Sequence, residues 1–285
     1  MVDVVRGSLV AVLLIALVSG CGERESAGGA DTSSVEGAPA KPASGYTVID
    51  VANGGSITGH VALRAGSTPP GEFQTPATQD VCSGGAVTNN NRLMPGPDGS
   101  IPWAIVRIRD IGSGKGFATG AAGGIILDQK QCQYLPHLVA VPVGGVIPIR
   151  NLDPVPHNIR IEDPASDSIL MNLVQATAGR VDSFTVDRPG AVIVRCDYHP
   201  WMNAYLFGVD NPYYAVTGPD GTFTIDGIPP GSYTVELWFN GPRILPKRTP
   251  NGTILGYGFS DPIIDQRPVT IAAGGRQELQ FEISP

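Results

Sequence analysis

Short apolar runs separated by turn residues dominate this sequence and limit what it can fold into. The runs are rich in Val and Ile, as in SITGHVALRA and IPWAIVRIRDI, and 37 Gly and 26 Pro among 285 residues interrupt them. β-branched residues favour strands, whereas Gly and Pro favour the turns between strands. No amphipathic segment of ordinary helix length stands out. The sequence therefore predicts an all-β protein, and 42% hydrophobic residues are enough for one large or two modest cores.

The charge of the chain argues against one class of partner. The formal net charge is -7 and the isoelectric point is about 5.0. Binding to nucleic acid needs clustered Lys and Arg that neutralise phosphates. We therefore expect no nucleic-acid partner.

The N-terminus has the pattern of an export signal. Arg6 precedes an apolar run, residues 9–18, which is too short for an ordinary membrane span. The run ends in Val-Ser-Gly-Cys, which resembles the bacterial lipobox, in which the cysteine receives a lipid and becomes the mature N-terminus. An ordinary signal peptide followed by a chance cysteine is the alternative. We expect residues 1–20 to be a lipoprotein signal peptide and Cys21 to be lipidated.

Residues 21–45 contain mostly Gly, Ala, Ser and Pro, which is typical of a flexible tether. The lipid would anchor the protein to a membrane of the cell envelope, on the periplasmic face or the outer surface. Gly22, rather than Asp, follows the cysteine, and this resembles the pattern for sorting to the outer membrane in enterobacteria. We therefore expect the outer membrane if the host is Gram-negative.

The cysteine count predicts one disulfide and one occupied thiol. Without Cys21, three cysteines remain, Cys82, Cys132 and Cys196, and thiols in an exported protein tend to pair. We expect Cys82 to pair with Cys132, which leaves Cys196 for a metal. Pairing of Cys132 with Cys196 is the competing possibility.

One loop contains three soft metal donors at regular spacing. In RCDYHPWMNAYL, residues 195–206, two residues separate Cys196 from His199, and two more separate His199 from Met202. Thiolate and thioether ligands select copper, and a chain that curls around the ion can bring such donors together. His157 stands 39 positions before Cys196, in a Pro-His-Asn segment at the start of an expected strand. Two imidazoles and a thiolate with a weak axial thioether suit both Cu(I) and Cu(II), and such a site relays single electrons.

Residues 118–209 resemble the cupredoxins, the small blue copper proteins. The resemblance rests on the strand and turn GGVIPIRNLDPVPHN and on the ligand loop, whose spacing is like that of amicyanin. It implies a Greek-key β-sandwich with one type 1 copper ion, held by His157, Cys196 and His199 in a plane and by Met202 on the axis. It also implies that Asn158 ties the two ligand-bearing loops together. A single-electron carrier of this kind needs a redox protein partner, and we expect the chain to be a monomer.

Each of these residues also has a purely structural interpretation. Taken singly, a turn histidine, a core methionine and a disulfide cysteine are common, and only the joint spacing favours a metal site. We do not expect the two remaining histidines, His60 and His137, to bind metal. Tyr198 and Trp201 either form an apolar docking patch beside His199 or cap the core.

The C-terminal segment resembles a second family, the carboxypeptidase regulatory-like or prealbumin-like β-sandwich. The phrases DGTFTIDGIPPG and SYTVEL are the basis of that resemblance, which implies that Phe223, Ile225, Tyr233 and Val235 point inward and implies no catalysis. Residues 210–285 would form this sandwich, and residues 46–117 contain strands that suit the same module. Either the two segments pair around an inserted 118–209 domain or two domains follow one another. The last run, RPVTIAAGGRQELQFEIS, reads as a closing hairpin.

The sequence favours a copper electron carrier over three other functions. A copper delivery or storage protein would use the same donors, but the Met-rich or His-rich tracts that favour it are absent. A structural or ligand-binding envelope lipoprotein would leave the copper loop unused. We do not expect an enzyme, because His-Glu-x-x-His, Gly-x-Ser-x-Gly and phosphate-loop motifs are absent and a Met-capped copper has no open position for substrate.

Overall fold

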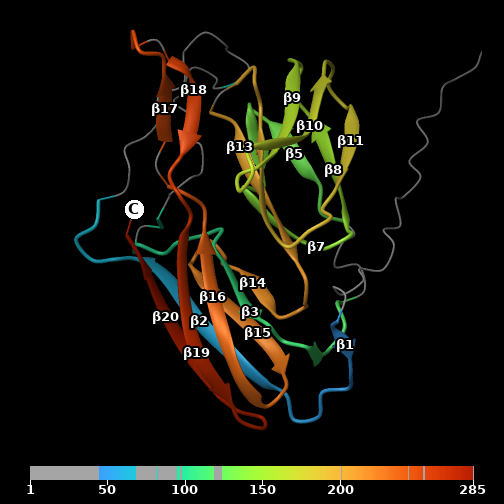
Figure 1. Ribbon diagram of the computed structural model, residues 1–285, viewed down its shortest axis with the longest axis vertical. Coiled ribbons are helices and arrows are strands. Elements are labelled where there is room, and N and C mark those ends of the chain that lie inside the picture. Colours follow the sequence, from blue (N-terminus) through green and yellow to red (C-terminus); the bar gives the residue numbers. More distant parts are fainter. Residues whose placement is uncertain are drawn as a thin grey trace, which may run out of the picture. The chain divides into compact units, whose positions relative to one another are not determined.

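Strands form the regular structure of the chain, and the expectation of an all-β protein is confirmed (Figure 1). The computed structural model describes residues 45–68, 82, 95–96, 98–118, 124–199, 201–242, 244–252 and 254–284, without the side chains of 244, 246–248 and 254–257. The expected signal peptide and Cys21 lie outside the described residues, as does the tether up to residue 44. Within the described ranges there is no helix long and apolar enough to cross a membrane.

The first sandwich consists of two facing sheets formed by residues 127–209. The larger sheet has the order β10-β9-β12-β13-β7, and the smaller has the order β11-β8-β5-β6. Their bounds are β5 Leu127–Lys130, β6 Gln133–Leu135, β7 Leu138–Pro142, β8 Val146–Asn151, β9 His157–Asp163, β10 Ser168–Gln175, β11 Val181–Thr185, β12 Gly190–Arg195 and β13 Asn203–Val209.

The strands of the second sandwich come from segments that precede and follow the first sandwich in the sequence. Its sheets have the orders β14-β3-β16-β19 and β15-β2-β20. Their bounds are β2 Gly55–Leu63, β3 Ile105–Arg109, β14 Tyr214–Val216, β15 Thr222–Ile228, β16 Gly231–Phe239, β19 Ile263–Ile271 and β20 Arg276–Ile283. Strands from 46–117 and from 210–285 therefore complete the same sheets around an inserted sandwich.

Two further short pairs of strands lie outside these sheets in the described part of the chain. β1 (Thr47–Val48) runs parallel to β4 (Ser113–Gly114), and β17 (Ile244–Arg248) is antiparallel to β18 (Ile254–Phe259).

The segment expected to be a closing hairpin has a different structure. β19 pairs with β16, whereas β20 runs parallel to β2 in the opposite sheet. The turn at Gly274, which has φ of +63°, therefore crosses from one sheet to the other. The prediction of a hairpin was wrong because a Gly-Gly turn marks a reversal of the chain but does not specify whether the two strands share a sheet.

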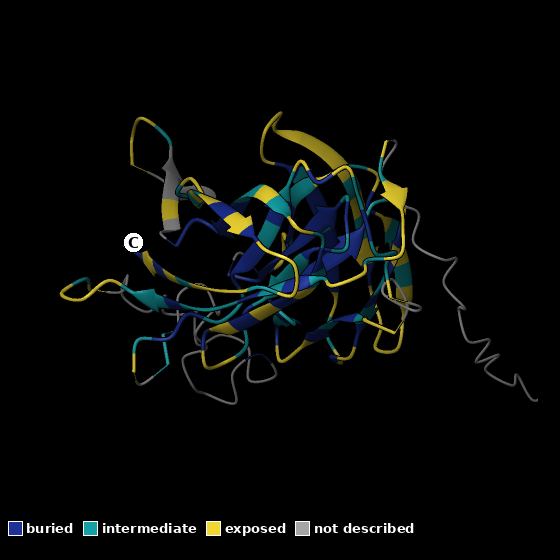
Figure 2. Ribbon diagram, turned by 90° about the horizontal axis from the view of Figure 1, so that it is seen from below, coloured by how far each residue is buried: buried dark blue, intermediate teal, exposed yellow. Residues whose placement is uncertain are grey.

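The burial pattern follows the alternation of the sequence. β15 alternates exposed and buried residues, as expected of a strand with one wet face, and Phe223, Ile225 and Val235 are buried while Tyr233 is partly buried. β7 and β13 are buried along their whole length. One face of these two strands lines the core of the first sandwich, and their other face packs on Ile105 and Trp238 of the second. Buried residues accordingly gather in the strands, and exposed residues lie mostly in loops and at edges (Figure 2).

Candidate metal centre

Two neighbouring strands of the larger sheet deliver the donors. β9 begins at His157 and β12 ends at Arg195, directly before Cys196, and these strands are antiparallel partners. The loop from Cys196 to Met202 then curls back, because the Met202 N–H donates to the His199 carbonyl at 2.8 Å. The curl brings His199 over the same end of the sheet as His157.

His157, Cys196 and His199 converge on one buried point. Cys196 Sγ lies 3.8 Å from His157 Nδ1 and 3.5 Å from His199 Nδ1, and the two Nδ1 atoms lie 3.0 Å apart. All three side chains are buried, and Cys196 is a free thiol. The ligand set expected from the sequence is therefore brought together at its three equatorial positions.

The spacing of these donors fits a first-row metal ion. With bonds of about 2.05 Å to nitrogen and 2.3 Å to sulfur, a trigonal plane puts neighbouring nitrogens roughly 3.6 Å apart and each nitrogen about 3.8 Å from the sulfur. The sulfur to nitrogen distances are 3.5 and 3.8 Å, and the nitrogen pair at 3.0 Å needs only a small separation. Two imidazoles and a thiolate are also the donor set that copper accepts in both oxidation states.

Asp153 orients the first histidine from behind. Its Oδ2 lies 2.8 Å from His157 Nε2, and the carboxylate also accepts the backbone N–H groups of Gln131 and Cys132 at 2.7 and 2.8 Å. Burial alone would raise the pKa of Asp153, but these three hydrogen bonds outweigh burial and hold the pKa below its ordinary value. A carboxylate at Nε2 favours the tautomer of His157 with its proton on that nitrogen, which leaves the Nδ1 lone pair for the centre.

Asn158 connects the two ligand-bearing segments. Its backbone N–H points at Cys196 Sγ at 3.3 Å, and its side-chain oxygen accepts the N–H of Asp197 at 3.2 Å. Tyr134, which is buried beneath, donates its hydroxyl to the carbonyls of Asn158 and Arg195 at 2.8 and 3.1 Å. The link expected of Asn158 is present, and Tyr134 fixes the same two strands from the facing sheet.

Burial sets the protonation of the two loop donors. It lowers the pKa of His199 to about 4, with a further contribution from the neighbouring His157, so the ring is neutral and able to ligate at neutral pH. Burial also raises the pKa of the Cys196 thiol, against the backbone N–H groups that favour the thiolate. A metal bound here must therefore displace the thiol proton.

The other predicted residues of the loop divide between core and surface. Met202 is 2% exposed and belongs to the same apolar core as Cys196. Trp201 is 5% exposed and donates its indole N–H to the Cys132 carbonyl at 3.1 Å, whereas Tyr198 is 53% exposed. Trp201 therefore caps the core, and only Tyr198 of the expected aromatic patch faces solvent.

The disulfide lies against the centre. Cys82 and Cys132 are bonded with sulfurs 2.08 Å apart, and Cys132 Sγ lies 4.0 Å from His199 Nε2. The two histidines not expected to bind metal lie elsewhere: His137 packs edge-on against Tyr205, and His60 Nε2 lies 3.0 Å from the Ser100 hydroxyl.

Asp153 and Tyr134 are parts of the site that sequence reasoning missed. The Asn-Leu-Asp-Pro turn reads as a simple reversal of the chain, but the Asp153 carboxylate accepts from the backbone of Gln131 and Cys132, which lie outside that turn. The signal available was its position four residues before a candidate histidine ligand. Nothing in the pattern around Tyr134 indicates its partners, because they come from strands far away in the sequence.

Comparison with known proteins finds similarity only among solved structures. No protein-family profile and no curated protein matches the sequence. A purple cupredoxin from Nitrosopumilus maritimus is 24% identical over 30% of this chain and 96% of its own, with a TM-score of 0.27. Amicyanin from Paracoccus versutus is 17% identical over 30% of this chain and 81% of its own, with a TM-score of 0.28.

A larger copper protein is similar over one part of its length. The copper-containing nitrite reductase from Thermus scotoductus SA-01 is 17% identical, with a TM-score of 0.26. The matched region covers 33% of this chain and 24% of the reductase. TM-scores this low describe a likeness to part of the chain only.

Proposed function

We propose that this chain is a lipid-anchored, type 1 copper protein that carries single electrons between redox partners in the cell envelope. The convergence of Cys196 Sγ, His157 Nδ1 and His199 Nδ1 on one buried point is the observation that supports it. These three residues would hold the copper ion, with Met202 as a fourth candidate ligand, and such a donor set supplies one-electron exchange with little change of geometry.

The chain contributes orientation and shielding. Asp153 and the backbone of β9 fix the His157 ring, and Asn158 and Tyr134 fix the loop that contains Cys196. These hydrogen bonds hold the donors close to the spacing that a metal ion needs. The core around Trp201 and Met202 excludes water from the centre.

The burial of the donors favours electron transfer over copper delivery. Delivery requires the ligands of a partner to reach the ion, but His157, Cys196 and His199 are each at most 2% exposed. An electron can pass through the surrounding bonds and needs no such opening. Export and the lipid on Cys21 belong to the proposal through the sequence of residues 1–45 alone, and the redox partner belongs to it through the function of a single-electron carrier.

The absorption spectrum of the copper-loaded full chain tests the proposal. A thiolate in a plane with two imidazoles gives Cu(II) an intense blue or violet charge-transfer band. Cys196→Ser should abolish this band, and His157→Ala should open the site and weaken copper retention. A protein that binds copper only as colourless Cu(I) would favour delivery or storage, and one that binds none at stoichiometric copper would leave a structural lipoprotein.

A further inference from the structure

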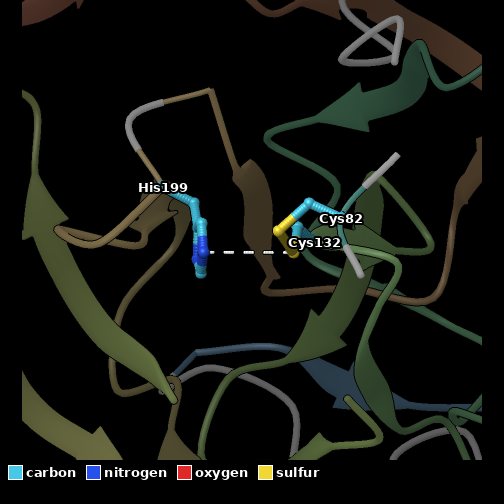
Figure 3. A group of neighbouring side chains, drawn as sticks. All are labelled: Cys82, Cys132 and His199. Atoms are coloured by element: carbon cyan, nitrogen blue, oxygen red, sulfur yellow. Dashed lines mark hydrogen bonds between the residues drawn. A yellow bond between two sulfur atoms is a disulfide. The ribbon is translucent and has the colours of Figure 1, made fainter. Parts of the chain in front are cut away.

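A second group of metal donors adjoins the proposed centre and shares one histidine with it. The ligand atoms of Cys82, Cys132 and His199 all lie within 4.8 Å of one another, and all three residues are buried. Figure 3 shows the His199 ring directed at the disulfide, with a dashed line that marks its contact with Cys132. Nδ1 of this ring faces Cys196, so Nε2 is the nitrogen that faces the two cysteines.

We propose that reduction of the Cys82–Cys132 disulfide creates a second copper site, in which the two thiolates and His199 Nε2 bind Cu(I). This site goes beyond the proposed electron carrier and depends on it only through the shared His199. The site would bind a monovalent soft cation, and it would form only after a dithiol has reduced the disulfide.

The geometry requires only one substantial movement. A three-coordinate ion with bonds of about 2.3 Å to sulfur and 2.05 Å to nitrogen needs sulfurs roughly 4.0 Å apart and sulfur to nitrogen distances of about 3.8 Å. Cys132 Sγ already lies 4.0 Å from His199 Nε2. The two sulfurs, which are bonded to each other in the disulfide, must separate, and cleavage of that bond removes the constraint that holds them together.

The donor set selects Cu(I) over other common ions. Thiolates bind Cu(I) and Zn²⁺ in preference to hard cations. Structural zinc sites are almost always four-coordinate, whereas the described residues of this group supply three donors. A three-donor set that is mostly sulfur and lies in a closed apolar core therefore suits the monovalent ion.

A dithiol can reduce this disulfide. Two electrons and two protons from the dithiol convert the disulfide into two thiols, and the dithiol becomes a disulfide. Binding of Cu(I) then releases the proton of each thiol to water. If His199 held one ion at each ring nitrogen, its Nε2–H proton would also be released to water.

Copper stoichiometry in the two redox states tests the proposal. The full chain carrying Cys21→Ser, so that every thiol is accounted for, is titrated anaerobically with Cu(I) against a chromophoric chelator, before and after reduction by a dithiol that is then removed. We expect one Cu(I) per oxidised chain and two per reduced chain. One ion in both states would overturn the second site, and so would a disulfide that stays closed in excess dithiol.

Two variants separate this site from the electron-transfer centre. Cys82→Ser with Cys132→Ser should bind one Cu(I) whatever the redox state, and two ions in this variant would place the second ion elsewhere. Cys196→Ser should gain one Cu(I) on reduction, because the second site does not use Cys196. If oxidised wild type binds none but reduced Cys196→Ser binds one, the proposed function fails and the second site stands. Cys82→Ser alone repeats the test if the double variant does not fold, and it should also lack the second tightly bound ion.

Discussion

Asp153 Oδ2 lies 2.8 Å from His157 Nε2, on the ring nitrogen that does not face Cys196. The same carboxylate accepts two backbone N–H groups from the segment that contains Cys132. Asp153 thus orients the candidate ligand His157, and the segment that contains Cys132 holds Asp153 in place. A carboxylate in this position makes the imidazole a stronger donor and fixes its tautomer.

Asp153→Asn should weaken copper binding without removing a ligand. The amide keeps the shape but loses the negative charge that strengthens His157, and loss of such a partner typically costs 10-fold to 100-fold in metal affinity. We expect a loss of that order in a Cu(II) competition titration, together with a higher reduction potential. Asp197→Asn is the matched control, because it makes the same change of charge next to Cys196 on a side chain that is 47% exposed. Equal losses in both variants would mean that net charge, rather than the hydrogen bond, is responsible.

Met202→Leu should keep the colour of the copper protein and raise its reduction potential. The three equatorial donors remain, and loss of the axial thioether disfavours Cu(II) more than Cu(I). Protein-film voltammetry and the absorption spectrum measure the two effects. Met171→Leu is the control, because Met171 packs against the same core but is not a candidate ligand. An unchanged potential in Met202→Leu would remove Met202 from the ligand set.

The sequence indicates the ligand set because three of its members lie close together and histidines are few in this chain. Cys196, His199 and Met202 lie within seven consecutive positions, and only three other histidines are available to complete the set. Asp153 and Tyr134 are different, because their roles depend on hydrogen bonds with residues up to 61 positions away. Such pairs are fixed by strand register, and one sequence does not specify which strands become neighbours.

The fold shows the same division between local and long-range information. Strand alternation is local, so β15 and its inward residues follow from TFTIDGI. The partners of β19 and β20 are long-range, and the expected hairpin around Gly274 failed for that reason. The full burial of β13 also depends on tertiary packing, because both of its faces meet apolar partners only when the second sandwich is present.

Removal of the disulfide should lower stability by about 4 kcal/mol. Cys82 and Cys132 are separated by 50 positions, and closing a loop of that length in the unfolded chain gives roughly this value. The double Cys82→Ala, Cys132→Ala variant should show it in urea unfolding of the metal-free protein. Thiol counting on the unfolded Cys21→Ser chain should give one thiol before reduction and three after. Peptide mapping identifies the bonded cysteines. A disulfide that includes Cys196, either within one chain to Cys132 or between two chains, would contradict the proposed centre.

Cys21→Ser should move the protein from the membrane fraction to the soluble fraction. Residues 18–21 are the whole basis for the expected lipid anchor, and the segment 22–45 has the composition of a flexible tether. Copper content per chain should not change, because the candidate ligands all lie more than 100 positions further along the sequence. Ser19→Ala, which keeps a small residue before the cysteine, is the control and should leave the protein in the membrane fraction. Membrane association that survives Cys21→Ser would exclude the lipobox interpretation.

Glu236→Gln should destabilise the second sandwich at neutral pH and lose this effect in acid. Glu236 is buried on β16, where its carboxylate contacts Arg107 at 2.8 Å and Arg109 at 3.1 Å. Burial alone would raise its pKa, but Arg107, Gln266 and Arg109 outweigh burial and hold the pKa below its ordinary value. A carboxyl group with a lowered folded-state pKa contributes stability above its unfolded-state pKa, and this contribution is lost as pH falls through the folded-state value.

The difference between wild type and Glu236→Gln should therefore be about 3 kcal/mol at pH 7, as for one partner removed from a buried ion pair, and should shrink below about pH 4.3. Urea unfolding of the metal-free proteins at pH 7 and pH 3 measures it. Glu278→Gln is the control, because Glu278 is exposed on β20 and its loss should change stability little at either pH. A Glu236→Gln deficit that stays the same at both values of pH would show that shape, rather than charge, sets the contribution of Glu236.

Loss of the charge also leaves Arg107 without its buried counter-ion. Arg107 lies 5.2 Å from the centre of the Phe207 ring in β13, so the effect should extend to the packing between the two sandwiches.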